Sequence, residues 1–231
     1  MNSKSIIITQ SNYIPWKGYI DAIAAVDVFV VYDDMQYTKR DWRNRNLIKT
    51  GQGRKWLSIP VDVKGKFYQK IKETKVSDIR WRESHLGQIK ETYRNAKQFQ
   101  EYWPLIESWY MKCDFEYLTE INVHFITQIC SELNIDTSIR FSSEFELEED
   151  RTDRLVSICQ ELGADQYYSG PAAKSYMEED KFRDSGIKLN YLDYSDYVEY
   201  PQLHDPFEHG VTILDMFFNL GDSTKDYLKF A

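Results

Sequence analysis

Cysteine is scarce in this chain, and its three cysteines form no recognisable pattern. Cys113, Cys130 and Cys159 are odd in number and lack the CxxC spacing of zinc sites and redox motifs. A disulfide framework and a cysteine-based zinc site are therefore not expected. This cysteine usage favours a reducing compartment, and we expect a cytoplasmic protein.

Long apolar runs are also missing. The N-terminal run at residues 5–9 is too short for the apolar core of a signal peptide. No other segment approaches the roughly 18 apolar residues that a membrane-spanning helix needs. We therefore predict no membrane span.

The chain has no excess of positive charge. Its 29 Lys and Arg residues are outnumbered by 37 Asp and Glu residues, which gives a net charge of −8. Proteins that bind the nucleic-acid backbone need a basic surface, so we expect no general nucleic-acid binding. A local basic pocket for a nucleotide or a phosphorylated sugar is still compatible with this balance.

Familiar catalytic motifs are absent too. The sequence contains neither a Walker loop nor a GxGxxG element. Ser169 is not the nucleophile of a GxSxG elbow, because the residues two before and two after it are not glycine. The four histidines lack the HExxH spacing of a zinc protease. Of these, His85 is the candidate for acid–base catalysis or a phosphate contact, although a structural surface position is the alternative.

Short β-branched runs alternate with helical patterns over much of the chain. Apolar runs at 5–9, 27–34 and 55–61 predict strands, and helical spacing follows Pro15. A strand, a ten-residue helix and a second strand form the pattern of a right-handed βαβ unit. The second half alternates in the same way, so we predict an α/β fold with a mostly parallel, Rossmann-like sheet. Its expected helices are 150–163, 174–186 and 212–221. A strand followed by a loop is expected at 137–145 and again at 165–170, and a strand at 187–194.

The middle of the chain differs from both ends. Residues 78–134 show helical patterns rich in aromatic residues and no clear strand, and Pro104 is expected to begin or kink one helix. We predict one α/β domain over residues 1–231, with this helical subdomain packed on the sheet or inserted into it.

A polar and aromatic loop follows the first predicted strand. Ligands of parallel sheets bind at the carboxyl ends of strands, where this loop would lie. The start of the next helix can also face an anion. The alternative is a loop whose aromatic side chains pack the helix onto the sheet. The candidate ligand-binding residues here are Gln10, Tyr13, Trp16 and Tyr19.

Two adjacent carboxylates end the second predicted strand. Asp33 and Asp34, followed by Gln36, are suited to bind Mg²⁺, to act as a general base or to hold a sugar hydroxyl. Side chains alternate along a strand, so only one of the two is expected to face a site. The alternative is an ordinary acidic turn.

A basic cluster stands out against the acidic balance of the chain. The sequence KRDWRNRN at 39–46 includes Arg43, Arg45 and Asn46 around Trp42. Arginine binds phosphates and carboxylates in a bidentate manner, so we predict that this cluster binds an anion. The alternative is a solvated loop paired with surface acids.

Ser169 and Gly170 connect a predicted strand to a predicted helix. Glycine lets the backbone approach a ligand, and serine and the helix start supply hydrogen-bond donors. The alternative is an ordinary strand-to-helix turn.

Several long motifs resemble the WbqC-like protein family. The opening TQSNYIPWKGYIDAIAAVDVFVVYDDMQYTKRDWRNRNLIK is similar to that family's signature, and WRESHLGQIKETY, LGADQYYSG and TILDMFFNLG follow in the family's order. The resemblance covers nearly the whole chain. It implies a place in bacterial O-antigen (lipopolysaccharide) and related surface-polysaccharide biosynthesis, where transfer of glycyl or other aminoacyl groups to an amino sugar has been proposed for some members. It supplies no established catalytic residues.

A second resemblance concerns layout. The chain is expected to begin with a strand, a loop that contains a proline, a helix, and a strand that ends in acidic residues. This order is similar to that of nucleotidyltransferase-like ligases such as pantothenate synthetase. Those ligases bind ATP phosphates with a His-x-Gly-His element, whereas this chain has PWKGYI. Lys17, Arg43 or Arg45 could replace the histidines, and ATP with Mg²⁺ is then the implied cofactor.

Together these features predict an acyl or aminoacyl transferase, or an ATP-dependent amide-forming ligase, acting on the amine of a nucleotide-linked amino sugar. The donor could be an ATP-activated acid, a thioester or a charged tRNA. The alternative is a non-catalytic protein that binds a nucleotide sugar or a partner of the pathway. The predicted base is Asp33, Asp34 or His85, and the predicted substrate contacts are Gln10, Tyr13, Trp16, Tyr19, Gln36, Arg43, Arg45, Asn46, Ser169 and Gly170.

Overall fold

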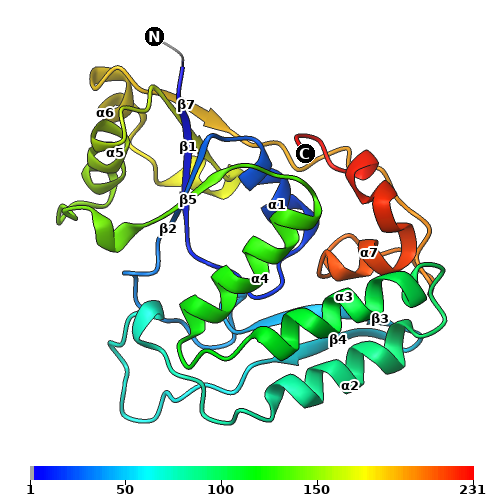
Figure 1. Cartoon of the computed structure of the whole chain (residues 1–231). Helices are drawn as coiled ribbons and strands as arrows, with labels where there is room; N and C mark the ends of the chain where they lie inside the picture. The colour runs from blue at the N-terminus through cyan, green and yellow to red at the C-terminus, as the bar shows by residue number, and fades with distance from the viewer. Residues whose placement is uncertain (1–2) are drawn as a thin grey trace.

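A five-stranded parallel sheet forms the centre of the computed structural model, which describes residues 3–231 (Figure 1). Its order is β5-β2-β1-β6-β7, and every neighbouring pair is parallel. The predicted α/β class with a mostly parallel sheet is therefore confirmed. The strands are β1 (Ser5–Thr9), β2 (Val28–Val31), β5 (Ser138–Phe141), β6 (Gln166–Ser169) and β7 (Lys188–Tyr191).

The order of the strands reverses at β1. The chain first adds β2 and β5 on one side of β1, and later adds β6 and β7 on the other side. Connections at such a switch point leave the two neighbouring strands in opposite directions, which opens a crevice at their carboxyl ends. The crevice is expected where β1 ends at Thr9 and β6 ends at Ser169.

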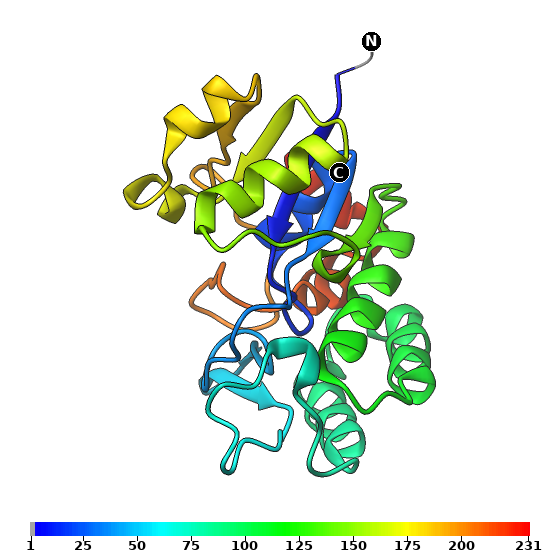
Figure 2. The same ribbon diagram turned by 90° about the vertical axis from the view of Figure 1, so that its left-hand side faces the viewer.

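Helices cover both faces of the sheet (Figures 1 and 2). Because side chains alternate along a strand, Ile7 of β1 enters the core with α1 (Lys17–Ala24) and α4 (Leu118–Glu132), whereas Ile6 and Ile8 enter the core of the other face. That second face is covered by α5 (Arg151–Glu161) and α6 (Glu179–Asp184).

The start of α5 is well defined. The carboxylate of Asp150 accepts hydrogen bonds from the backbone N–H groups of Thr152 at 2.9 Å and Asp153 at 3.0 Å, as an N-cap does. At the other end, Gly163 takes the left-handed conformation that follows many helices, with a φ of 63°. The cap fixes the direction in which the first turn of α5 leaves the sheet edge.

The helical middle region is confirmed. Residues 78–134 contain α2 (Trp81–Tyr93), α3 (Phe99–Lys112, with Pro104 inside it) and α4, and they contain no strand. These helices pack with α7 (Leu214–Leu220) around buried aromatic rings such as Trp109, Phe125 and Phe217. Across residues 3–231, no helix is both long and apolar enough to cross a membrane.

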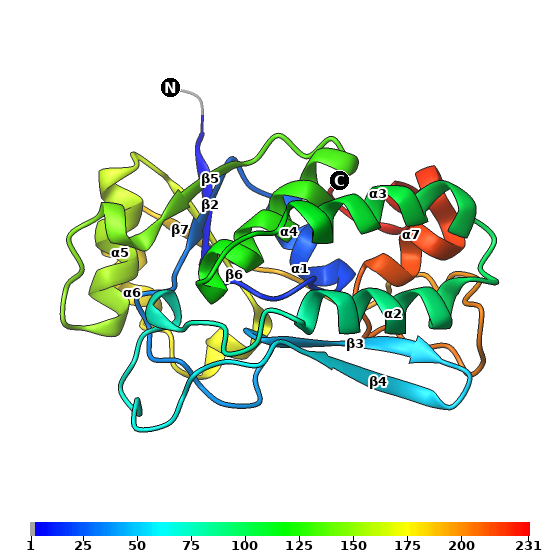
Figure 3. The ribbon, with the colours of Figure 1, turned by 60° about the horizontal axis from the view of Figure 1, so that its bottom comes forward.

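One expected loop is a strand. β3 (Arg45–Thr50) and β4 (Gly53–Ser58) form an antiparallel hairpin separate from the main sheet, which lies beside α2 in Figure 3. The sequence predicted a strand near β4 but a loop before it. The polar residues of β3 conceal its burial: Leu47 and Ile48 point to opposite sides of the strand, both are buried, and Ile48 joins the main core.

The helix expected at 174–186 is shorter and divided. A 3₁₀ turn, η3 (Pro171–Ser175), follows β6, and α6 starts only at Glu179. Three other 3₁₀ segments connect the main elements: η1 (Ile71–Glu73), η2 (Ser142–Glu144) and η4 (Gly221–Tyr227).

Candidate functional site

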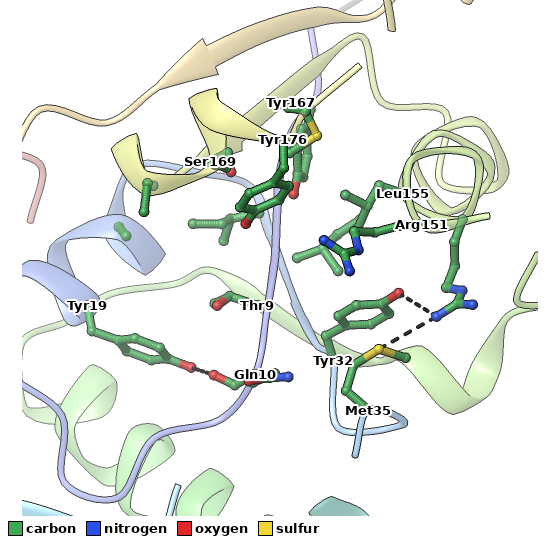
Figure 4. A pocket seen from close by; sticks show the side chains of 18 of the residues that line it. Thr9, Gln10, Tyr19, Tyr32, Met35, Arg151, Leu155, Tyr167, Ser169 and Tyr176 are labelled. Carbon is green, nitrogen blue, oxygen red and sulfur yellow. Dashed lines mark hydrogen bonds between the residues drawn. The ribbon is translucent and has the colours of Figure 1, made fainter. Parts of the chain in front are cut away.

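A cavity of about 770 Å³ lies at the switch point of the sheet, at the carboxyl ends of β1 and β6 (Figure 4). Its wall also includes residues after β2, the first turns of α5, and η3. This volume is within the range of small-molecule sites, about 300–1,000 Å³. The cavity is thus where an α/β sheet of this topology binds its ligand.

Five of the predicted substrate-binding residues line this cavity: Gln10, Tyr19, Arg43, Ser169 and Gly170. Three of them are joined by hydrogen bonds. The Tyr19 hydroxyl donates to the Gln10 carbonyl at 2.9 Å, and the Arg43 guanidinium donates to the same carbonyl at 3.3 Å. These contacts fix the path of the chain as it leaves β1, and they position Gln10 at the cavity.

Two further arginines line the cavity. Arg154 donates hydrogen bonds to the Tyr32 hydroxyl at 3.2 Å and the Glu148 carbonyl at 2.6 Å, so it holds the loop before α5. Arg151 has no hydrogen bond or ion pair to any residue between 3 and 231, and its guanidinium carbon lies 5.5 Å from the ring centre of Tyr176. Neither arginine was among the residues predicted from the sequence. The available signal was two arginines at the start of a helix, where the helix dipole disfavours positive charge.

Tyrosine rings form much of the remaining wall. Tyr32, Tyr176 and Tyr194 line the cavity together with Tyr19, and Figure 4 shows Tyr32 and Tyr176 near Arg151. Burial raises the pKa of Tyr194 to about 12, and it raises that of Tyr19 well above its ordinary value. Both hydroxyls are therefore neutral at physiological pH. That of Tyr19 already donates to the Gln10 carbonyl, so Tyr194 is the one of the two that can donate to a ligand. A wall of arginines and tyrosines suits a ligand with anionic groups and rings.

The loop after β1 is held in a strained conformation. Ile14 has a φ of 33°, which is rare for a β-branched residue. The buried Asn46 amide donates to the carbonyls of Tyr13 and Ile14, both at 2.9 Å, and the Tyr13 N–H donates to the Trp42 carbonyl at 3.0 Å. Asn46 and Tyr13 thus shape the loop, but neither lines the cavity.

His85 belongs to a buried chain of hydrogen bonds instead of the cavity. Its Nε2 lies 3.2 Å from the Ser58 carbonyl, and its Nδ1 lies 2.8 Å from the Tyr13 hydroxyl, which lies 2.6 Å from that of Tyr110. A neutral ring that donates from Nε2 and accepts at Nδ1 satisfies both contacts. Burial lowers the pKa of His85 to about 4, against the opposing effect of the Ser58 carbonyl.

This pKa makes the stability of the protein pH-dependent. Unfolded His85 binds a proton near its ordinary pKa of 6.5, whereas folded His85 does so only near pH 4. The unfolded state therefore binds more protons between these values, and stability falls as the pH falls. We expect His85 to account for about 2 kcal/mol of lost unfolding free energy between about pH 7.5 and pH 5.

Urea unfolding of the parent protein and of His85→Gln at the two pH values measures this contribution. Glutamine can keep both hydrogen bonds but does not titrate. The loss of unfolding free energy between pH 7.5 and pH 5 should be about 2 kcal/mol smaller in the variant than in the parent protein. An equal drop in both proteins would show that His85 is protonated in the folded state at pH 5.

Asp33 is buried and does not line the cavity. Its carboxylate accepts hydrogen bonds from the Ser11 N–H at 2.9 Å, the Ser11 hydroxyl at 2.6 Å and the Thr119 hydroxyl at 2.6 Å. The Asn122 amide in turn donates to the Ser11 hydroxyl at 2.9 Å. Burial raises the pKa of Asp33, although these donors oppose the rise. Asp33 therefore ties the loop after β1 to α4.

Asp34 is occupied by partners of its own. Its carboxylate lies 2.5 Å from the Lys72 ammonium and 3.3 Å from that of Lys70, and it accepts a hydrogen bond from the Ser142 hydroxyl at 2.9 Å. Burial would raise the pKa of Asp34, but the two lysines and Ser142 outweigh it and lower the pKa. The pair Asp33–Asp34 thus joins the end of β2 to four other segments: the loop after β1, α4, η1 and η2.

The other predicted positions also lie outside the cavity. The Trp16 ring covers Gly18 so closely that an added Cβ there would lie 2.4 Å from Cζ2, and it packs edge-on against Tyr194. The Arg45 guanidinium stacks on Trp56, with its carbon 3.9 Å from the ring centre. Gln36 donates to the Phe67 carbonyl at 2.8 Å.

Lys17, Arg43 and Arg45 were the candidates to replace the missing phosphate-binding histidines. Of these, only Arg43 lines the cavity. The Lys17 ammonium lies 4.7 Å from the ring centre of Tyr197 and 5.3 Å from that of Tyr200, in a buried position. Among residues 3–231, no three His, Cys, Asp or Glu side chains gather as a metal site would require.

Comparisons with known proteins found one matching family model and one similar protein. The model of the WbqC-like protein family matches residues 10–227. A protein of Mycobacterium tuberculosis described as uncharacterized protein Rv1507c is 44% identical over 228 residues, which is 99% of each chain. Comparison with solved structures found no match.

Proposed function

The chain belongs to the WbqC-like protein family, and from that starting point we propose that it transfers a glycyl or other small acyl group to the amine of a nucleotide-linked amino sugar. The observation that carries this proposal is the convergence of Arg43, Arg151 and Arg154 on one cavity at the switch point of the sheet. This convergence is notable in a chain whose net charge is −8. One arginine guanidinium can donate two parallel hydrogen bonds to the oxygens of a phosphate. Three arginines around one cavity therefore fit a ligand that carries a diphosphate.

The rest of the cavity wall fits the two other parts of the reaction, which are the base and sugar rings of the nucleotide sugar and the acyl group to be transferred. Tyr32 and Tyr176 offer ring faces for a base or a sugar, and the Tyr19 hydroxyl is tied to the loop that carries Gln10. Ser169 and Gln10, at the ends of adjacent strands, supply polar groups to orient the acyl carbonyl and its developing oxyanion. The sugar amine would then lie between the two strand ends.

Amide formation requires a neutral amine and a base. The amine nitrogen attacks the acyl carbonyl, the new C–N bond forms, and the leaving group departs with the electron pair of the broken bond. The base takes the proton that the nitrogen loses. We assign this role to Glu149, the only acidic residue among those described that line the cavity. Asp33, Asp34 and His85 are held in other contacts away from it.

The test is turnover. The protein is incubated with a UDP- or TDP-linked amino sugar and a panel of glycine with ATP and Mg²⁺, glycyl thioester and glycyl-tRNA, and the sugar is followed by mass spectrometry. A mass gain equal to one glycyl residue with one of the donors supports the transferase. ATP consumption that accompanies the gain identifies the ligase version.

Non-catalytic nucleotide-sugar binding is the second candidate. It is favoured by a specific observation: all three acid–base residues predicted from the sequence lie outside the cavity wall. Saturable binding of the nucleotide sugar without product from any donor supports this candidate. In that case Glu149→Gln leaves the affinity unchanged, because no proton is transferred.

A further inference from the structure

The loop at residues 62–70, between β4 and η1, displays two aromatic side chains to solvent. Phe67 is 74% exposed and Tyr68 is 83% exposed, which makes them the two most exposed large hydrophobic side chains among the described residues. Their rings touch edge to face, with centroids 5.0 Å apart and planes at 90°. The loop projects from the lower edge of the molecule in Figure 1 (cyan). Two exposed aromatic rings in contact with each other make this loop a candidate interaction surface.

Backbone conformation and hydrogen bonds hold the loop in the shape that exposes the two rings. Gly65 takes a left-handed conformation with a φ of 73° at the turn. The Lys66 N–H donates to the Val63 carbonyl and the Gln69 N–H donates to the Lys66 carbonyl, both at 3.3 Å. The Gln36 amide also donates to the Phe67 carbonyl at 2.8 Å. The loop is therefore held in a shape that keeps the two rings outside the core.

The loop lies within the basic part of an acidic chain. Residues 35–76 carry twelve Lys and Arg against three Asp and Glu, while the whole chain has a net charge of −8. The rest of the chain is thus strongly acidic. Lys64 and Lys66 are exposed beside the aromatic pair, and Lys66 contacts Asp62 at 2.6 Å in a solvent-exposed ion pair of the weak kind.

We propose that the loop at residues 62–70 docks this protein onto an anionic lipid bilayer. Phe67 and Tyr68 enter the interfacial zone, where aromatic side chains of membrane proteins concentrate. Lys64 and Lys66 contact lipid phosphates, while their alkyl stems lie along the apolar boundary. The acidic remainder of the chain is repelled by the same surface, so the field of the protein orients the loop towards the bilayer.

The geometry of the rings favours a bilayer over a nucleic acid. Single-stranded nucleic acids are bound by aromatic rings that stack on successive bases along a basic groove. The rings of Phe67 and Tyr68 are perpendicular, so they cannot both stack on successive parallel bases. Neither residue lines any of the described cavities. A pair of perpendicular rings at a loop tip is compatible with insertion between lipid headgroups.

Vesicle co-sedimentation of the chain of residues 1–231 tests the proposal. Vesicles of equal parts phosphatidylcholine and phosphatidylglycerol should bind the protein, and vesicles of phosphatidylcholine alone should not. The double variant Phe67→Ser/Tyr68→Ser should weaken binding about tenfold or more. The double variant Lys64→Glu/Lys66→Glu should weaken it still further, since each basic residue near an anionic surface contributes about fivefold.

Matched controls come from elsewhere on the surface. Met111→Ser removes another hydrophobic side chain, one that is 72% exposed on α3, and should leave vesicle binding unchanged. The idea is overturned if the parent chain ignores the anionic vesicles, or if the aromatic variant binds them as well as the parent. Saturable binding of poly-uridine RNA without vesicle binding would assign the loop to nucleic acid instead. The inference does not rest on the proposed transferase, because no arm of the test uses turnover.

Discussion

Arg151→Ala weakens the binding of a UDP-linked amino sugar by about 10- to 100-fold, the loss expected when one charge-assisted contact to a phosphate is removed. Arg151 is the cavity arginine that has no hydrogen bond or ion pair to any residue between 3 and 231. Its charge is therefore available to a ligand. A role in supporting the fold would require hydrogen-bond or ion-pair partners, and Arg151 has none within the part of the chain that the structure describes.

The stability of the variant separates binding from folding. Because Arg151 is exposed and has no hydrogen bond or ion pair to any described residue, its removal should change the unfolding free energy by less than about 0.5 kcal/mol. Isothermal titration gives the affinity and urea unfolding gives the stability. Arg151→Lys keeps the charge without the planar fork, so it should recover part of the affinity.

Arg183→Ala is the matched control. Arg183 lies on α6, pairs with Asp184 at 3.0 Å on the surface, and does not line the cavity. Its removal should leave the affinity unchanged. Equal affinity of Arg151→Ala and the parent protein would remove the diphosphate from the proposed substrate.

The strands and the helix that position the site could be predicted from the sequence, because they depend on local patterns. The apolar run at 5–9, the helical spacing after Pro15 and the run at 27–34 are signals within a few residues of each other. Together they predict a βαβ unit, and that unit places Gln10 at a strand end. The same logic placed Ser169 at the end of a later strand, and the structure makes the two strands neighbours.

The roles of individual polar residues could not be predicted, because they depend on partners far away in the chain. One of the hydrogen bonds that Asp33 accepts comes from Thr119, 86 positions later, and His85 is joined to Tyr13 across 72 positions. The residues around a carboxylate at a strand end are the same whether or not a distant residue donates a hydrogen bond to it. The local sequence therefore cannot show that the carboxylate is already occupied. Arg151 was missed for the converse reason: it lies in an ordinary helix whose first turn happens to face the cavity.

Asp33→Ala lowers the unfolding free energy by about 3 to 5 kcal/mol. The substitution leaves the N–H and hydroxyl of Ser11 and the hydroxyl of Thr119 without their acceptor in the interior. Each buried donor left unpaired costs about 1 to 3 kcal/mol. Urea unfolding measures the loss, and Asp184→Ala, which removes an exposed carboxylate, should cost less than about 0.5 kcal/mol.

Asp33→Asn then distinguishes positioning from catalysis. The amide oxygen can still accept from the Ser11 N–H, and the Ser11 and Thr119 hydroxyls can rotate to accept from the amide N–H₂. The loop after β1 therefore keeps its place, and stability falls less than in Asp33→Ala. If Asp33 only positions the loop, turnover of the amino sugar stays within about tenfold of the parent. Loss of a general base instead costs about 10²- to 10⁴-fold, and that result would return Asp33 to the catalytic role that the sequence predicted.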